Sequence, residues 1–242
     1  MNILVTGGTS GLGKAIVELM AADVNRQVCF TYLDTPEYRE VVADMGKCYP
    51  NVTAYPLQFC DRDNVKEFCG LMQTMDLDAL VNCTYVGSPQ GIYFHKTPIE
   101  DFEKSFGNNI VPTILLTQTA IECFKKKRFG KIVNIISEAV MGLPPMGYSI
   151  YAANKAYLMK LSDEWNKEYT RYNITSNCVL PAFMNTGLTN TDPRIVEQLE
   201  MQHPLKKLLT PEEVAVVVKF LLEAPQQVNG VKMPVNAAEI IM

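Results

Sequence analysis

The sequence predicts an α/β protein built on one doubly wound parallel sheet, and three observations support this prediction. Short apolar runs rich in β-branched residues alternate with longer segments of helical periodicity along nearly the whole chain. The apolar runs are continuous, which is typical of strands that helices cover on both faces. A glycine-rich turn lies directly between the first apolar run and the first helical segment. We therefore expect a three-layer sandwich with about seven strands.

The alternation assigns each expected element in turn. The last expected helix has the clearest start signal, with Thr210 as N-cap, Pro211 as the first helical residue and two glutamates in the first turn. No repeat or low-complexity linker interrupts the pattern, so residues 1–242 are expected to form a single domain. The expected strands are 2–5, 27–32, 52–56, 79–82, 131–136, 175–180 and 232–235, and the expected helices are 11–22, 62–74, 99–123, 151–169 and 211–224.

Composition and charge narrow the class of protein. Of the 242 residues, 48% are hydrophobic and 20% are charged, which is close to the globular average. No apolar run approaches the roughly 18 residues of a membrane span, and from the first residues we expect no secretory signal. A net charge of −4 disfavours binding to nucleic acid. The seven cysteines are scattered and the two histidines are isolated, so we expect a cytoplasmic protein with free thiols and no metal site.

The turn after the first strand has the composition of a phosphate-binding loop. Thr6 to Gly13 reads TGGTSGLG. Glycines permit a tight turn and a close approach of the backbone to a ligand, and the helix that follows directs its first amides at a pyrophosphate. A plain β–α turn is the alternative interpretation. The loop lacks the Gly-Lys-Ser/Thr ending of a nucleoside-triphosphatase, so it favours a Rossmann-type dinucleotide-binding fold.

A tyrosine and a lysine lie four residues apart on one expected helix. Tyr151 and Lys155 share a helical face, so the phenol and the ammonium can converge on one point. The ammonium is expected to lower the pKa of the phenol, as a proton donor to a carbonyl requires. On their own, the two residues could equally belong to an ordinary amphipathic helix. Ser137 ends the preceding strand 14 residues earlier, which favours a shared site.

These features together resemble the short-chain dehydrogenase/reductase family, and in particular its short single-domain branch with 3-oxoacyl-acyl-carrier-protein reductase-like members. The glycine spacing, the serine, and the Tyr-x-x-x-Lys pair occur in the family's order over nearly all of the chain. The resemblance implies that Tyr151 is the general acid/base and that Lys155 binds the nicotinamide ribose. It also implies that Ser137 orients the substrate oxygen and that Asn109 holds a water of the proton relay.

The resemblance further implies a nicotinamide cofactor, NADP or NAD. Tyr32 ends the second strand, where a carboxylate would bind the ribose hydroxyls of NAD and reject a 2′-phosphate. Ser10 stands in the loop where NADP-binding members often carry a basic residue. Because this carboxylate is missing at Tyr32, the sequence slightly favours NADP over NAD. The expected cofactor-binding residues are Gly7, Thr9, Ser10, Gly11, Leu12, Gly13, Tyr32, Asp61, Asn82, Tyr151, Lys155, Pro181 and Thr186.

Two regions depart from the family pattern or allow two interpretations. Tyr85 ends a segment, Asn82 to Tyr85, where the family usually has Asn-Asn-Ala-Gly beside the cofactor, and Ala182 replaces a glycine. The segment 183–209, with Met184, Leu188, Ile195, Leu199 and Met201, either covers the substrate or packs as ordinary core.

We therefore expect an NAD(P)-dependent oxidoreductase that transfers hydride between the cofactor and a small-molecule carbonyl or secondary alcohol. The resemblance implies a homotetramer, or a homodimer, assembled through the helices at 99–123 and 151–169. Two alternatives stay open at this point. One is a catalytically weak NAD(P)-binding regulatory or assembly protein, and the other is a sugar-nucleotide epimerase, which usually needs a larger substrate domain.

Overall fold

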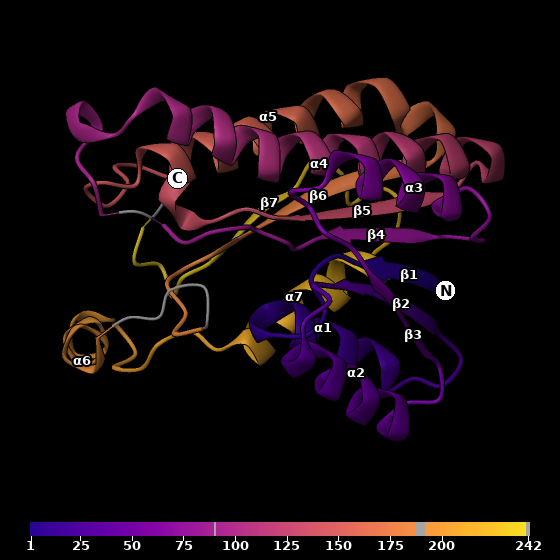
Figure 1. The fold of residues 1–242 in the computed structure, drawn as a ribbon, viewed down its shortest axis with the longest axis horizontal. Helices are drawn as coiled ribbons and strands as arrows, with labels where there is room; N and C mark the ends of the chain where they lie inside the picture. Colours follow the sequence, from indigo (N-terminus) through magenta and orange to yellow (C-terminus); the bar gives the residue numbers. More distant parts are fainter. Residues whose placement is uncertain (90, 187–191, 241–242) are drawn as a thin grey trace.

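The computed structural model of the chain describes residues 1–89, 91–186 and 192–240 (Figure 1). Within these residues seven strands form one parallel sheet, in the order β3-β2-β1-β4-β5-β6-β7. The order reverses at β1, which pairs with β2 on one side and with β4 on the other. The expected doubly wound, Rossmann-type sheet is confirmed. Its strands are β1 (Asn2–Val5), β2 (Gln27–Tyr32), β3 (Val52–Pro56), β4 (Ala79–Asn82), β5 (Gly130–Ile135), β6 (Ile174–Pro181) and β7 (Lys232–Val235).

Helices cover both faces of this sheet and make it the middle of three layers (Figure 1). One face carries α1 (Gly11–Ala21), α2 (Pro36–Cys48) and α7 (Pro211–Glu223), and the other carries α3 (Arg62–Met72), α4 (Ile99–Lys127) and α5 (Ser149–Tyr169). The helix α6 (Pro193–Gln202) lies apart from both layers (Figure 1). Short 3-10 turns occur at Phe94–Lys96, Glu138–Val140 and Thr170–Tyr172.

The core lies on both faces of the central strands, which explains why many of their residues are apolar. Every residue of β4, β5 and β6 is buried. On one face Ile16 of α1 belongs to a cluster with Val218 of α7. On the other face Leu116 and Phe124 of α4 pack with Leu80 of β4. Burial from both sides leaves these strands no solvent-facing positions for polar residues.

Two helices, α2 and α6, were not expected from the sequence. Met45 is the one buried residue of α2, and α6 has none, so neither carries the buried apolar stripe that produces helical periodicity. Both begin with an N-cap followed by proline, Thr35-Pro36 and Asp192-Pro193. The strands differ from the expected ranges by at most one residue at either end.

Three further properties bear on the class of protein. None of the described helices is long and apolar enough to span a membrane. No three His, Cys, Asp or Glu side chains come together as a possible metal site in the part of the chain that the structure describes. All seven cysteines are free, and Cys123 and Cys178 are buried.

Candidate active site

The main cavity of the molecule opens where the sheet order reverses, at the carboxyl ends of the strands. It has a volume of about 900 Å³ and extends from Tyr32 and Tyr38 past the glycine loop to Ser137 and Tyr151. Ligands of doubly wound sheets bind at this switch point. The expected site residues that line the cavity are Gly7, Thr9, Ser10, Gly11, Leu12, Gly13, Tyr32, Ser137, Tyr151, Lys155, Pro181 and Thr186.

The glycine loop presents backbone to this cavity. A side chain is excluded at Gly13, because a Cβ there would lie 1.9 Å from the carbonyl oxygen of Gly7, whose own φ is +73°. Strand β2 fixes the loop, since the amide of Gly7 donates to Thr31 Oγ1 at 3.1 Å. Ser10, the N-cap of α1, makes no side-chain capping bond. The first amides of α1 therefore remain available for an anion in the cavity.

The residues present fit a nicotinamide dinucleotide. Thr84 lines the cavity beside the loop, and its buried Oγ1 has no hydrogen-bond partner in the described part of the chain. A Cβ on Gly7 would meet this oxygen at 2.8 Å, so Thr84 and the loop face the same space. An orphaned hydroxyl beside free helix amides is what a ribose–pyrophosphate segment would satisfy.

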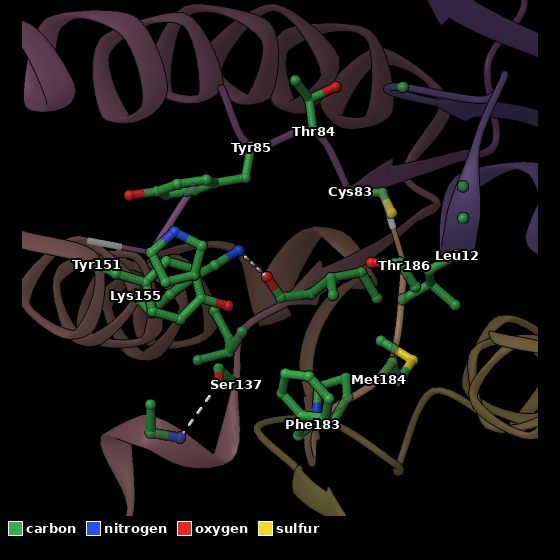
Figure 2. A pocket seen from close by; sticks show the side chains of 18 of the residues that line it. Leu12, Cys83, Thr84, Tyr85, Ser137, Tyr151, Lys155, Phe183, Met184 and Thr186 are labelled. Atoms are coloured by element: carbon green, nitrogen blue, oxygen red, sulfur yellow. Dashed lines mark hydrogen bonds between the residues drawn. The ribbon is translucent and has the colours of Figure 1, made fainter. Parts of the chain in front are cut away.

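Ser137, Tyr151 and Lys155 converge at the other end of the cavity (Figure 2). Ser137 follows β5, and Tyr151 and Lys155 occupy the first turns of α5. The Ser137 hydroxyl lies beside the Tyr151 phenol, and its oxygen accepts from the Ala139 amide at 3.2 Å. Lys155 Nζ donates to the Ile135 carbonyl at 2.8 Å and lies 5.7 Å from the centroid of the Tyr151 ring. The expected convergence of phenol and ammonium is thus observed.

Burial dominates the electrostatics of this set. It raises the pKa of Tyr151 to about 12, while Ser137 acts in the opposite direction. Burial also lowers the pKa of Lys155 to about 8, against the effect of the Cys83 thiol. The expectation that the ammonium lowers the pKa of Tyr151 is therefore wrong, because burial raises this pKa and Lys155 is not among the groups that shift it. The phenol is protonated at neutral pH, which is the state that a proton donor needs.

Asp61 does not line the main cavity. Its carboxylate accepts hydrogen bonds from the amides of Asp63 and Asn64, both at 3.0 Å, and so caps the N-terminus of α3. Gln58 lines this end of the cavity instead. The sequence contained the signal for this assignment, because an aspartate directly before an acidic first turn is a preferred N-cap.

Asn82 and Asn109 are also absent from the lining of the main cavity. The Asn82 amide donates to Thr117 and Asn134 side chains inside the core, at 3.1 and 2.8 Å. Asn109 Oδ1 accepts from the Val86 amide at 2.6 Å, which ties α4 to the loop after β4. Asn109 lines a second, smaller cavity, and its water-holding role stays a prediction.

Several lining residues were not singled out by the sequence. Tyr38, Gln58, Glu138, His203 and Glu239 all line the main cavity. Glu138 directly follows Ser137, and burial together with Glu239 raises the pKa of its carboxyl group. These residues lie in five separate segments of the sequence, so no local sequence pattern could have identified them as neighbours in one cavity.

The segment 183–209 contributes to the cavity in part. Met184, Ile195 and Leu199 line it, as a cover over the substrate would require, whereas Met201 is exposed. Leu188 lies outside the described residues.

A glycine-rich loop at a helix N-terminus and a half-buried, protonated phenol in one cavity fit hydride transfer to and from a nicotinamide. Fold and site together thus define a nicotinamide-dependent oxidoreductase. The short chain dehydrogenase family matches residues 1–195 of the chain. The chain therefore belongs to the short-chain dehydrogenase/reductase family, and it is an NAD(P)-dependent oxidoreductase of that family.

Individual relatives agree with this membership. A 3-oxoacyl-acyl-carrier-protein reductase of Aquifex aeolicus is 31% identical over 240 residues, which cover 96% of this chain and 94% of the relative. A solved short chain dehydrogenase/reductase family protein superposes with a TM-score of 0.83 at 31% identity, over 98% of this chain and 96% of that one. The structure of ElxO with NADP bound gives a TM-score of 0.85 at 25% identity, over 98% and 97%. These similarities do not favour the regulatory or the epimerase alternative.

Proposed function

We propose that the protein is an NADPH-dependent reductase of a carbonyl substrate. The observation that carries this proposal is the Tyr151 phenol, which is half-buried beside Ser137 and protonated at neutral pH, in the cavity that also contains the glycine loop. Tyr32 supports NADPH over NADH, because no carboxylate stands there to repel a 2′-phosphate. The NADP in the ElxO structure supports the same choice.

The chain's own residues have separate tasks in the proposed reaction. The amides between Gly7 and Gly13 bind the pyrophosphate, and Lys155 binds the nicotinamide ribose. Pro181 and Thr186, which also line the cavity, would hold the nicotinamide. The nicotinamide supplies the hydride that reduces the carbonyl carbon.

Proton transfer completes the reduction. Tyr151 donates its phenolic proton to the substrate oxygen, so that one hydride and one proton convert the carbonyl to an alcohol. The Ser137 hydroxyl donates a hydrogen bond to the same oxygen and stabilises the charge that develops on it. The Lys155 ammonium, 5.7 Å from the Tyr151 ring centroid, compensates the phenolate that remains.

The lining of the cavity supports a substrate that is neutral around its reacting group. Of the lysines and arginines in the described chain, Lys155 alone lines the main cavity, whereas Glu138 and Glu239 contribute carboxylates. Leu143, Phe183 and Leu199 add apolar surface. A 3-oxoacyl thioester, the substrate type named for the Aquifex aeolicus relative, satisfies these conditions.

We further propose that residues 1–242 act as one dinucleotide-binding and catalytic domain, within a homotetramer or homodimer in the cytoplasm. Phe106 of α4 and Tyr157 of α5 support the assembly through these helices. Both side chains are exposed and pack edge to face, with ring centroids 5.2 Å apart. Seven free thiols support a reducing compartment.

A carbonyl panel assayed with NADPH and with NADH tests the function. The panel contains 3-oxoacyl thioesters, ketones, aldehydes and keto sugars. We expect Tyr151→Phe to lower kcat by about 10²- to 10⁴-fold, because it removes the general acid. Fluorescence titration should show NADPH affinity within about threefold of wild type, because the glycine loop is intact.

Two results would overturn the proposal. A wild-type protein that binds NADPH but reduces no member of the panel would exclude the reductase. A preference for NADH of about tenfold or more would exclude the cofactor assignment.

A further inference from the structure

Tyr85 lies between the two cavities of the site. It follows β4 in the loop that leads towards α4, and it lines both the main cavity and the smaller one, as Tyr151 does. The family usually has a small residue at this position, whereas this chain has an aromatic one. Figure 2 shows the ring directed toward Tyr151 and Lys155.

The Tyr85 ring contacts both members of the proton-transferring pair. It meets the Tyr151 ring edge to face, with centroids 4.9 Å apart and an interplanar angle of 75°. Lys155 Nζ lies over the Tyr85 ring, 5.2 Å from its centroid. The first contact restricts how far the phenol can turn, and the negative face of the ring attracts the ammonium.

The hydroxyl end of Tyr85 lies at the junction of two helices. The side chains of Ser105 on α4 and Asn154 on α5 lie beside it and act to lower its pKa, against the effect of burial. Asn154 Nδ2 also donates to Ser105 Oγ at 2.9 Å, and Asn109 Nδ2 donates to the Ser105 carbonyl at 3.0 Å. The ring is therefore anchored at its backbone by the β4 loop, and its tip lies at the α4–α5 junction.

The Tyr85 ring adds to the support of the Lys155 ammonium, which donates a hydrogen bond to the Ile135 carbonyl at 2.8 Å. Lys155 is 6% exposed and forms no salt bridge with any described carboxylate. The titratable groups that face the Tyr151–Lys155 pair are Cys83 after β4, Tyr85, and Tyr148 before α5. The smaller cavity adds Asp101 and Lys104 of α4, and the main cavity adds Glu138, His203 and Glu239.

We propose that Tyr85 is a positioning residue, which holds the Tyr151 phenol in place and stabilises the positive charge of Lys155 in a site without a paired carboxylate. The inference rests on the proposed roles of Tyr151 and Lys155. Because burial alone disfavours the ammonium, loss of the ring face shifts Lys155 further toward its neutral form. The phenolate that forms on Tyr151 then loses its compensating charge.

The direct test is the pKa of Lys155, measured by NMR of protein labelled with 13C-lysine and without cofactor. The Lys155 signal is assigned by its loss in Lys155→Met. In Tyr85→Leu and Tyr85→Met we expect this pKa to fall by about 0.5 to 1 unit, which corresponds to one cation–π contact. In Tyr85→Phe the ring is kept, and the pKa should stay within about 0.2 unit of wild type.

Tyr148→Leu is the matched control. Tyr148 also meets the Tyr151 ring edge to face, at 6.1 Å, but the ammonium lies over Tyr85 and Tyr151. Its removal should leave the pKa of Lys155 unchanged. An unchanged pKa in both non-aromatic Tyr85 variants, or an equal shift in Tyr148→Leu, overturns the proposal.

Kinetics provide a second readout that loss of folding would not imitate. In Tyr85→Leu the pH at half-maximal alcohol oxidation should rise by about the same 0.5 to 1 unit, with the KM for cofactor within about twofold of wild type. A fall in kcat without any change of this pH midpoint contradicts the electrostatic role. If the NMR shift occurs but wild type turns over no carbonyl, Tyr85 still supports Lys155 and the reductase proposal alone fails.

Discussion

The glycine loop and the Tyr151–Lys155 pair share one cavity, but they are built in opposite ways. The loop acts through backbone, and the condition it sets on the sequence is the absence of side chains, as the 1.9 Å approach at Gly13 shows. The pair acts through two side chains that burial shifts away from their ordinary pKa values. The glycine loop cannot accommodate a Cβ at Gly13. The Tyr151–Lys155 pair depends instead on the neighbouring groups that shift the pKa values of its two side chains.

The largest effect that follows from this comparison is at Gly13. In Gly13→Ala the new Cβ meets the Gly7 carbonyl oxygen, so the loop must leave its binding conformation. We expect dinucleotide affinity to fall by about 100-fold or more, measured by fluorescence titration with NADPH. Gly46→Ala in α2 is the matched control, because no atom lies within 4 Å of its Cβ. That variant should gain about 0.5–1 kcal/mol in free energy of unfolding, and NADPH affinity retained in Gly13→Ala would contradict the backbone role.

Lys155→Met should separate activity from stability. We expect kcat to fall by about 10²-fold or more, because the phenolate loses its compensating charge. The buried ammonium destabilises the fold, since its pKa is about 8 in the folded chain and 10.5 in the reference state. Below about pH 8 the lysine is charged in both states, and its charge is disfavoured only in the folded state, so Met should raise the free energy of unfolding by about 1–3 kcal/mol.

The pH dependence of this gain supplies the check. The advantage of Lys155→Met should be fully present below about pH 8 and disappear as the pH rises to about 10.5, where Lys155 is neutral in both states. Urea unfolding of both proteins across this range measures it. A gain that is the same at all pH values would mean that packing, and not charge, causes it.

The smallest effect is expected at Tyr32, the side chain proposed to set the preference for NADPH over NADH. In Tyr32→Asp a carboxylate at the end of β2 can bind ribose hydroxyls and repels a 2′-phosphate. The ratio of kcat/KM with NADPH to that with NADH should fall by about tenfold. Tyr38→Phe, which changes a neighbouring lining residue without adding charge, serves as the control. An unchanged ratio in Tyr32→Asp would mean that the 2′-phosphate of NADPH does not bind beside residue 32.

The same contrast explains how much of the molecule the sequence predicts. Strands buried on both faces follow from continuous apolar runs, and the loop follows from glycine spacing. The helices α2 and α6 do not follow, because their burial is too slight to produce a pattern. Ser137, Tyr151 and Lys155 converge as expected. Ser137 directly follows β5, and Tyr151 and Lys155 lie on one face of α5, so the local structure determines where these side chains point. Ser105 and Asn154 lie beside Tyr85 but belong to helices far apart in the sequence, so no local sequence pattern could predict that they come together.

The packing of α1 along α7 has a consequence for the order in which the protein is made. Side chains of α1 such as Ile16 and Met20 share a buried cluster with Val214 and Leu222 of α7, which is synthesised about 200 residues later. Until α7 has left the ribosome, this face of α1 has no cover and is open to chaperones and to other nascent chains. The glycine loop directly before α1 is thus translated early, whereas the helix that packs on α1 is translated near the end of the chain.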